Sequence, residues 1–128
     1  MESKKYLFVL THAATKPLEV LVHFKIASNM KAFDDSIDIA FFLVDEGVRL
    51  AKKGVAESIS LEFEGKKVNL GEMLDMLSEF DVKFYVCQAF LPGFQMTKED
   101  FIGNAEEKSS AYLGELLLNG YIPFTLNI

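Results

Sequence analysis

The only cysteine among the 128 residues, Cys87, carries the side chain best suited to covalent chemistry. It directly follows an apolar run at residues 82–86, which predicts a strand buried on both faces with the thiol at its carboxyl end. Backbone N–H groups at the start of a following turn or helix favour the thiolate, the form that attacks sulfur and other electrophiles. The alternative is a structural cysteine that packs as a small hydrophobic residue.

Thr11 and His12 follow another apolar run, at residues 6–10. In open parallel sheets, ligands bind at the carboxyl ends of the strands, near the point where the strand order reverses, so both residues are candidate neighbours of Cys87. His12 could act as a base or as a cationic neighbour of the thiolate if the two strands are adjacent. The alternative for His12 is a polar loop residue without a chemical role.

Asp45 and Glu46 follow the third apolar run, at residues 37–44. By the same argument about strand ends, they are expected to form an acidic pair at the mouth of the site. Asp45 serves equally well as the cap of a following helix. Gln88 and Phe90 complete the set of expected site neighbours, because they lie immediately beyond the cysteine.

The composition argues against several classes of function. A net charge of −6 and only paired lysines speak against a general affinity for nucleic acid. No apolar stretch is long enough to cross a membrane, and no glycine-rich phosphate loop follows the first apolar run. Two histidines and one cysteine give no zinc spacing, so neither a metal nor a cofactor is expected. A single cysteine, which cannot form an internal disulfide, fits the reducing cytoplasm.

Alternating apolar runs and helical patterns predict one doubly wound, three-layer α/β domain over residues 1–128, with a mostly parallel sheet of about four to five strands. Besides the three runs above, a strand is expected at 121–126, on a sheet edge because Pro123 cannot donate to a ladder. A small hairpin or an irregular excursion is expected at 55–68. Helices are expected at about 16–30, from 45 to 54, from Asn69, from Thr97 to Asp100, and from Asn104 through 118.

Four stretches of the sequence are similar to the DsrE/DsrF-like family of small sulfur-relay proteins. They are a first strand and loop at residues 7–12, a second strand with its Asp-Glu-Gly-Val turn at 41–48, and a strand ending in Tyr-Val-Cys at 82–87. The fourth is the closing half, residues 96–100 with the expected helix at 111–118. The resemblance covers nearly the whole chain, and the order and spacing of the four stretches make it specific.

This resemblance implies a small α/β sandwich that assembles into a homo-oligomer, a trimer or a hexamer. It also implies that the cysteine at position 87 carries sulfur as a persulfide, received from a donor protein and passed to the thiol of an acceptor protein. Such a chain is at most a sulfurtransferase-like carrier rather than an enzyme with turnover of its own. Many members have a second cysteine where this chain has Phe90, so an internal C-x-x-C redox couple is excluded.

Two other functions remain open at the level of sequence. In the first, the chain is a binding or assembly module without chemistry, and Phe90, Phe94 and Met96 line a small apolar pocket or a subunit interface near the cysteine. In the second, Cys87 senses redox state or peroxide by forming a sulfenic acid, for which the chain has no resolving cysteine.

Overall fold

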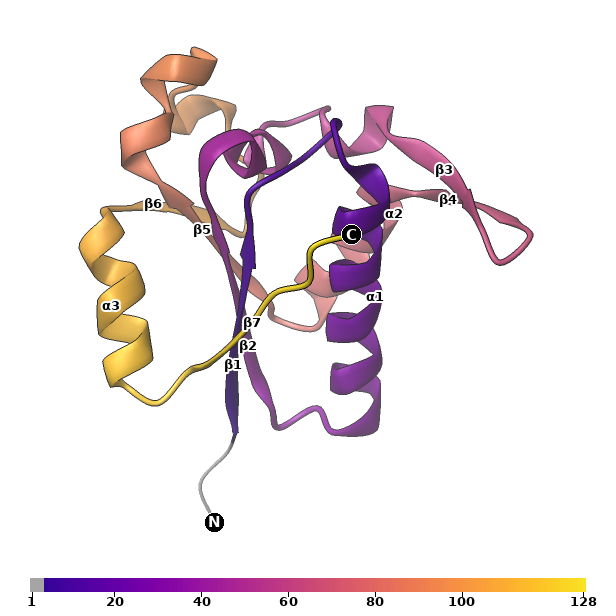
Figure 1. Ribbon diagram of the computed structural model, residues 1–128, viewed down its shortest axis with the longest axis horizontal. Helices are drawn as coiled ribbons and strands as arrows, with labels where there is room; N and C mark the ends of the chain where they lie inside the picture. Colours follow the sequence, from indigo (N-terminus) through magenta and orange to yellow (C-terminus); the bar gives the residue numbers. More distant parts are fainter. Residues whose placement is uncertain (1–3) are drawn as a thin grey trace.

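The computed structural model describes residues 4–128, and a five-stranded sheet with the strand order β6-β5-β2-β1-β7 lies at its centre (Figure 1). All neighbouring strands of this sheet run parallel. The bounds are β1 (Lys5–Leu10), β2 (Asp38–Leu43), β5 (Lys83–Cys87), β6 (Ala105–Lys108) and β7 (Ile122–Phe124). The predicted parallel sheet is therefore confirmed.

Helices cover both faces of the sheet. One face carries α1 (Pro17–Phe33) and α2 (Leu70–Glu79), and the other carries α3 (Ser110–Leu118) (Figure 1). Pro17 occupies the first turn of α1, where its missing N–H has no helical partner to lose. Of the helices in residues 4–128, none has the length and apolar character of a membrane span. The doubly wound, three-layer arrangement confirms the expected fold class.

Successive residues of each strand point to opposite faces and build two unequal cores. The larger core lies under α1 and α2, and in it strand register aligns Phe8 of β1, Phe41 of β2 and Phe84 of β5. Their rings are stacked, with centroids 5.1 Å apart for Phe8 and Phe41 and 4.8 Å apart for Phe41 and Phe84. The smaller core lies under α3 and includes Cys87 and Leu116.

The connection from β2 to α2 contains the excursion that the sequence left unresolved. It begins with two 3-10 helices, η1 (Asp45–Ala51) and η2 (Ala56–Ser58), and continues as the antiparallel hairpin β3 (Ser60–Phe63) and β4 (Lys66–Asn69). The turn at residues 64 and 65 has φ values of 54° and 77°, which the two-residue hairpin turn requires. Asn69 then caps α2 by accepting the N–H of Glu72 at 3.2 Å, as expected.

The structure of residues 104–108 differs from the helix predicted for them. A helix was expected to begin at Asn104, but residues 105–108 form β6, and α3 begins at Ser110. The Asn104 side chain instead donates to the carbonyl of Val82 at 3.1 Å, and the backbone carbonyl of Asn104 accepts the N–H of Phe84. Pairing with β5 therefore overrides the local preference of a polar stretch for a helix.

Candidate functional site

Cys87 is the last residue of β5 and is buried, with 1% of its surface exposed. Its side chain belongs to the core under α3, together with Leu7, Ala40, Phe42 and Leu116. The strand end predicted from the apolar run is thus where the thiol lies. Its environment, however, consists of aliphatic and aromatic side chains.

The segment beyond Cys87 contains no long helix. It runs through three short 3-10 helices, η3 (Gln88–Phe90), η4 (Pro92–Phe94) and η5 (Lys98–Asp100), before it reaches β6. Gln88 and Phe90 both lie at the surface. Neither of them therefore seals the thiol, whose cover comes from the sheet and α3.

The strand order reverses between β1 and β7, because β2, β5 and β6 are added on one side of β1 and β7 on the other. Thr11 and His12 follow β1 and therefore lie at this switch point, the usual place for a ligand in an open parallel sheet. Cys87 ends β5, which is separated from β1 by β2. The structure thus divides the predicted site residues between the switch point and the end of β5.

His12 faces α1. Its Nδ1 atom lies 2.9 Å from Oε1 of Glu19 on that helix and 3.1 Å from the hydroxyl of Thr11. Cys87 packs on the opposite face of the sheet, under α3. In this arrangement the imidazole is held by Glu19 and is not directed at the thiol.

Glu46 fastens the loop after β1 to the loop after β2. Its carboxylate accepts the N–H of Ala13 at 2.8 Å, the N–H of Thr15 at 3.3 Å and the hydroxyl of Thr15. Burial opposes ionisation of Glu46, but these hydrogen bonds outweigh it and lower the pKa of the carboxyl. Asp45, its neighbour, is exposed, has a φ of 51° and takes part in none of the side-chain hydrogen bonds found among the described residues.

Glu19 and His23, one helical turn apart on α1, form a buried polar connection that the sequence did not predict. His23 donates from Nδ1 to the carbonyl of Glu19 at 2.7 Å and accepts the N–H of Leu126 on Nε2 at 2.9 Å. The Glu19 carboxylate accepts the N–H of Ile128 at 3.3 Å. The residues after β7 are therefore hydrogen-bonded to α1 beside the switch point between β1 and β7. The spacing of four residues between Glu19 and His23 was the only sign of this polar connection in the sequence.

Acid should destabilise the fold through Glu19 and Glu46. Burial opposes ionisation of Glu19, yet the hydrogen bonds from His12 and Ile128 lower the pKa of this carboxyl below the ordinary 4.5, as they do for Glu46. A lowered native pKa adds stability above the ordinary value, and this stability is lost as the pH falls through the native pKa. We expect the urea midpoint to fall as the pH drops below about 4.5, measured by circular dichroism.

Glu46→Gln should flatten this acid dependence, because the amide cannot lose a charge. Asp75→Asn is the matched control, since Asp75 is an exposed carboxylate of α2 and forms none of the hydrogen bonds found among the described residues. An acid dependence unchanged in Glu46→Gln would show that the hydrogen bonds to this carboxylate do not hold the two loops together.

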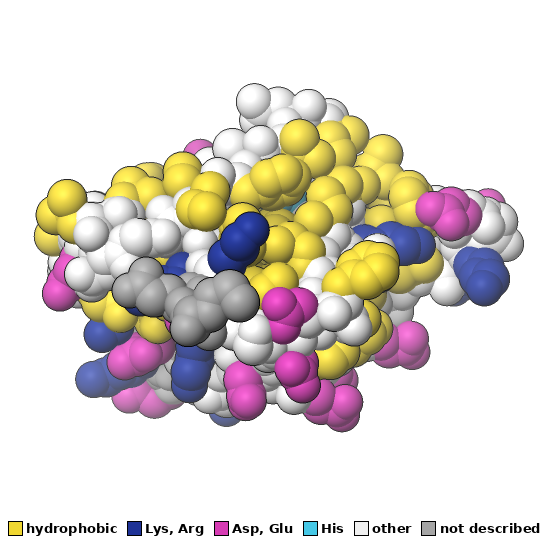
Figure 2. Space-filling view, turned by 90° about the horizontal axis from the view of Figure 1, so that it is seen from below, with side chains coloured by type: hydrophobic (Ala, Val, Ile, Leu, Met, Phe, Trp, Pro, Cys, Tyr) yellow, Lys and Arg dark blue, Asp and Glu magenta, His cyan; other side chains and the backbone are white. Residues whose placement is uncertain are grey.

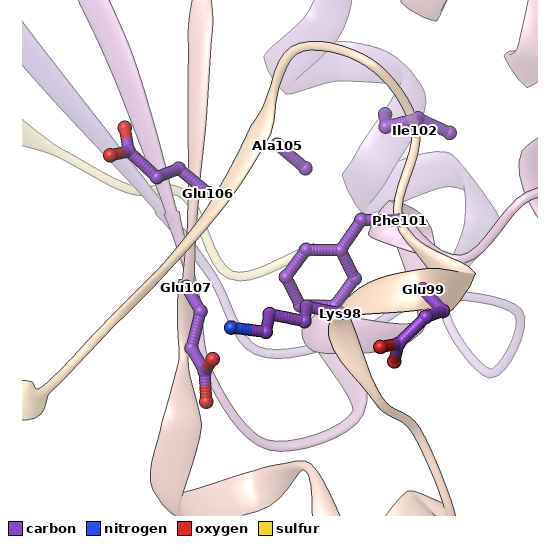
Figure 3. A pocket seen from close by; sticks show the side chains of 7 residues that line it. All are labelled: Lys98, Glu99, Phe101, Ile102, Ala105, Glu106 and Glu107. Atoms are coloured by element: carbon purple, nitrogen blue, oxygen red, sulfur yellow. The ribbon is translucent and has the colours of Figure 1, made fainter.

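A cavity of about 570 Å³ lies on the outer side of β6, between that strand and η5 (Figure 3). Phe101 and Ala105 form its wall, and Lys98 extends towards Glu107 across its mouth. Cys87 does not line this cavity. Across residues 4–128, no group of three histidine, cysteine or acidic side chains is placed to hold a metal ion.

Comparison with known proteins supplies a family and a fold. The model of the DsrE/DsrF-like family matches residues 4–126. The crystal structure of the YchN protein from E. coli is similar with a TM-score of 0.76 at 18% identity, covering 94% of this chain and 99% of that one. MTH1491 from Methanobacterium thermoautotrophicum, described as a protein of unknown function, has a TM-score of 0.71 at 17% identity, covering 94% of this chain and 98% of that one. No curated protein matches the sequence.

Proposed function

The chain belongs to the DsrE/DsrF-like family, and on that basis we propose that it carries sulfur, with Cys87 holding a sulfane sulfur as a persulfide between a donor protein and an acceptor protein. The observation that carries this proposal is the position of the only thiol of the sequence, at the carboxyl end of a central-sheet strand. Loops rather than long helices follow β5, so a partner can approach this edge of the sheet.

The transfer consists of two thiol exchanges. In the first, the thiolate of Cys87 attacks the outer sulfur of a donor persulfide, the donor S–S bond breaks, and the donor leaves as a thiolate. Cys87 now holds the persulfide. In the second, an acceptor thiolate attacks the outer sulfur of this persulfide and releases Cys87 as a thiolate. No net oxidation occurs, and one cysteine suffices because each partner supplies the other thiol.

Access to the thiol is the requirement that the fold imposes on this chemistry. With 1% of its surface exposed, Cys87 cannot meet a donor protein unless its cover opens. Of the sheet and α3, which together cover the thiol, α3 is the more easily displaced. It is short and is anchored by the buried Leu116, whereas the sheet is held in place by the larger core on its opposite face. Displacement of α3 would uncover the thiol without breaking the sheet.

Intact-mass measurement after incubation with glutathione persulfide tests the proposal. The native protein is expected to gain one sulfur atom that a reductant removes, and Cys87→Ser to gain none. Leu116→Ala should raise the rate of alkylation of Cys87 roughly tenfold or more, because a truncated anchor favours the open state. Alkylation rates measured against pH in the same samples report the ionisation of the thiol.

The control for Leu116→Ala is Glu115→Ala, at the neighbouring position of α3, which is exposed and lies outside the apolar surface described below. If Cys87→Ser took up as much sulfur as the native protein, the carrier function would be wrong. If Leu116→Ala and Glu115→Ala were alkylated equally fast, α3 would not be the gate.

The burial of Cys87 favours a second function, an assembly module that keeps the fold without the chemistry. A broad hydrophobic area lies on the face seen in Figure 2, and α3, β7 and the carboxyl-terminal residues leave apolar side chains exposed. These are Leu117, Leu118, Ile122, Leu126 and Ile128. We propose that such a surface joins copies of this chain into a homo-oligomer. A thiol that gains no sulfur, even in Leu116→Ala, would leave this second function in place of the first.

A further inference from the structure

A groove of about 390 Å³ lies between α1, α2 and the β3–β4 hairpin. Its apolar lining comes from all three: Leu21 of α1, Phe63 and Val68 of the hairpin, and Met73 and Met76 of α2. It lies on the side of the sheet covered by α1 and α2, away from the core that contains the thiol. Its volume is in the range of pockets that hold small organic ligands.

Lysines surround this apolar surface. Lys25, Lys66 and Lys67 line the groove with one carboxylate, Glu72, in a chain whose net charge is −6. Lys66 is paired with Phe63 across the hairpin, so both side chains share the face that packs towards α1. The groove is therefore locally cationic, opposite in sign to the molecule as a whole.

Lys25 is free to exchange its present partners for a ligand. Its ammonium lies 5.0 Å from the ring centroid of Phe63 and 3.8 Å from Oε1 of Glu64 at the tip of the hairpin. Both members of this ion pair are exposed, so the pair itself contributes little. An anionic group at the mouth of the groove would meet Lys25 and Lys66 together.

We propose that this groove binds an amphiphilic carboxylate, with the aliphatic tail on Phe63, Met73 and Met76 and the carboxylate between Lys25 and Lys66. The charge at the rim selects an anion, and the apolar lining selects its tail. The walls can adapt to such a tail, because methionine side chains are flexible and a two-stranded hairpin is weakly held on its own. This binding is independent of sulfur transfer at Cys87.

Methyl-labelled methionine NMR with sodium decanoate tests the proposal directly. The methyl signals of Met73 and Met76 are expected to shift with saturation, whereas that of Met96, which does not line the groove, stays in place. Decyltrimethylammonium, which has the same tail and the opposite charge, should leave all three unchanged. The double variant Lys25→Glu/Lys66→Glu should weaken decanoate binding about tenfold, the effect of reversing two partly exposed charges.

Lys4→Glu/Lys53→Glu is the matched control, because both residues are exposed, neither lines the groove, and the change in net charge is the same. Equal binding of the anion and the cation, or equal weakening in the two double variants, would overturn the proposal. Methyl signals of Met73 and Met76 that shift with protein concentration alone would overturn it too, and would assign the groove to a second copy of the chain.

Discussion

Replacing Gly47 by alanine is expected to destabilise the fold by about 3 kcal/mol, at the upper end of the usual cost of overpacking. A Cβ atom at this position would lie 2.9 Å from the carbonyl carbon of Leu10 and closer still to its oxygen. These are backbone atoms at the end of β1, and the same carbonyl accepts the N–H of Val44 at 3.0 Å. These atoms cannot move without disturbing the ends of β1 and β2 together, and Thr11 and His12 directly follow β1.

Urea denaturation of Gly47→Ala measures this loss, and Gly114→Ala in α3 provides the control. A Cβ atom at Gly114 meets nothing within 4 Å, so alanine there should stabilise the protein by up to about 1 kcal/mol through its helix propensity. A Gly47→Ala variant as stable as the native protein would contradict the close packing of η1 against the end of β1.

The sequence predicted the inner strands well because their side chains are buried on both faces. The run that became β1 is continuously apolar, and those that became β2 and β5 are interrupted only by Asp38 and Lys83 at the exposed starts of the strands. Such runs are typical of strands in a parallel sheet that is covered on both faces. β6 gave no such signal, since Ala-Glu-Glu-Lys is largely exposed at a sheet edge and is a strand only because it pairs with β5. Its pairing partner lies outside any local window of sequence.

The position of Cys87 was predictable, but its direction was not. Alternation along β5 directs the side chains of Val86 and Cys87 to opposite faces of the sheet. Which face is covered by α1 and which by α3, however, depends on the path of the whole chain. That path directs His12 to Glu19 and Cys87 to Leu116. The hydrogen bond from Leu126 to His23 likewise depends on long-range packing, and no local motif predicts it.

Phe41→Ala is expected to cost about 3–5 kcal/mol, the usual loss for truncating a fully buried phenylalanine. The ring of Phe41 is fully buried and stacks between Phe8 and Phe84. Phe24 of α1 meets the same ring edge-on, with centroids 5.5 Å apart at 79°. One side chain thus joins three strands and the helix above them, and the surrounding backbone is hydrogen-bonded too regularly to collapse into the cavity left by its loss.

The free energy of unfolding of Phe41→Ala, set against that of Phe33→Ala, tests this row of rings. Phe33 ends α1 and is 91% exposed, so its truncation should change stability by less than about 0.5 kcal/mol. Because Phe41 faces α1 and Cys87 faces α3, Phe41→Ala should also alter the thiol only through global unfolding. Alkylation of Cys87 that rose while the unfolding free energy stayed unchanged would contradict the division of the protein into two cores, on which the gate at α3 depends.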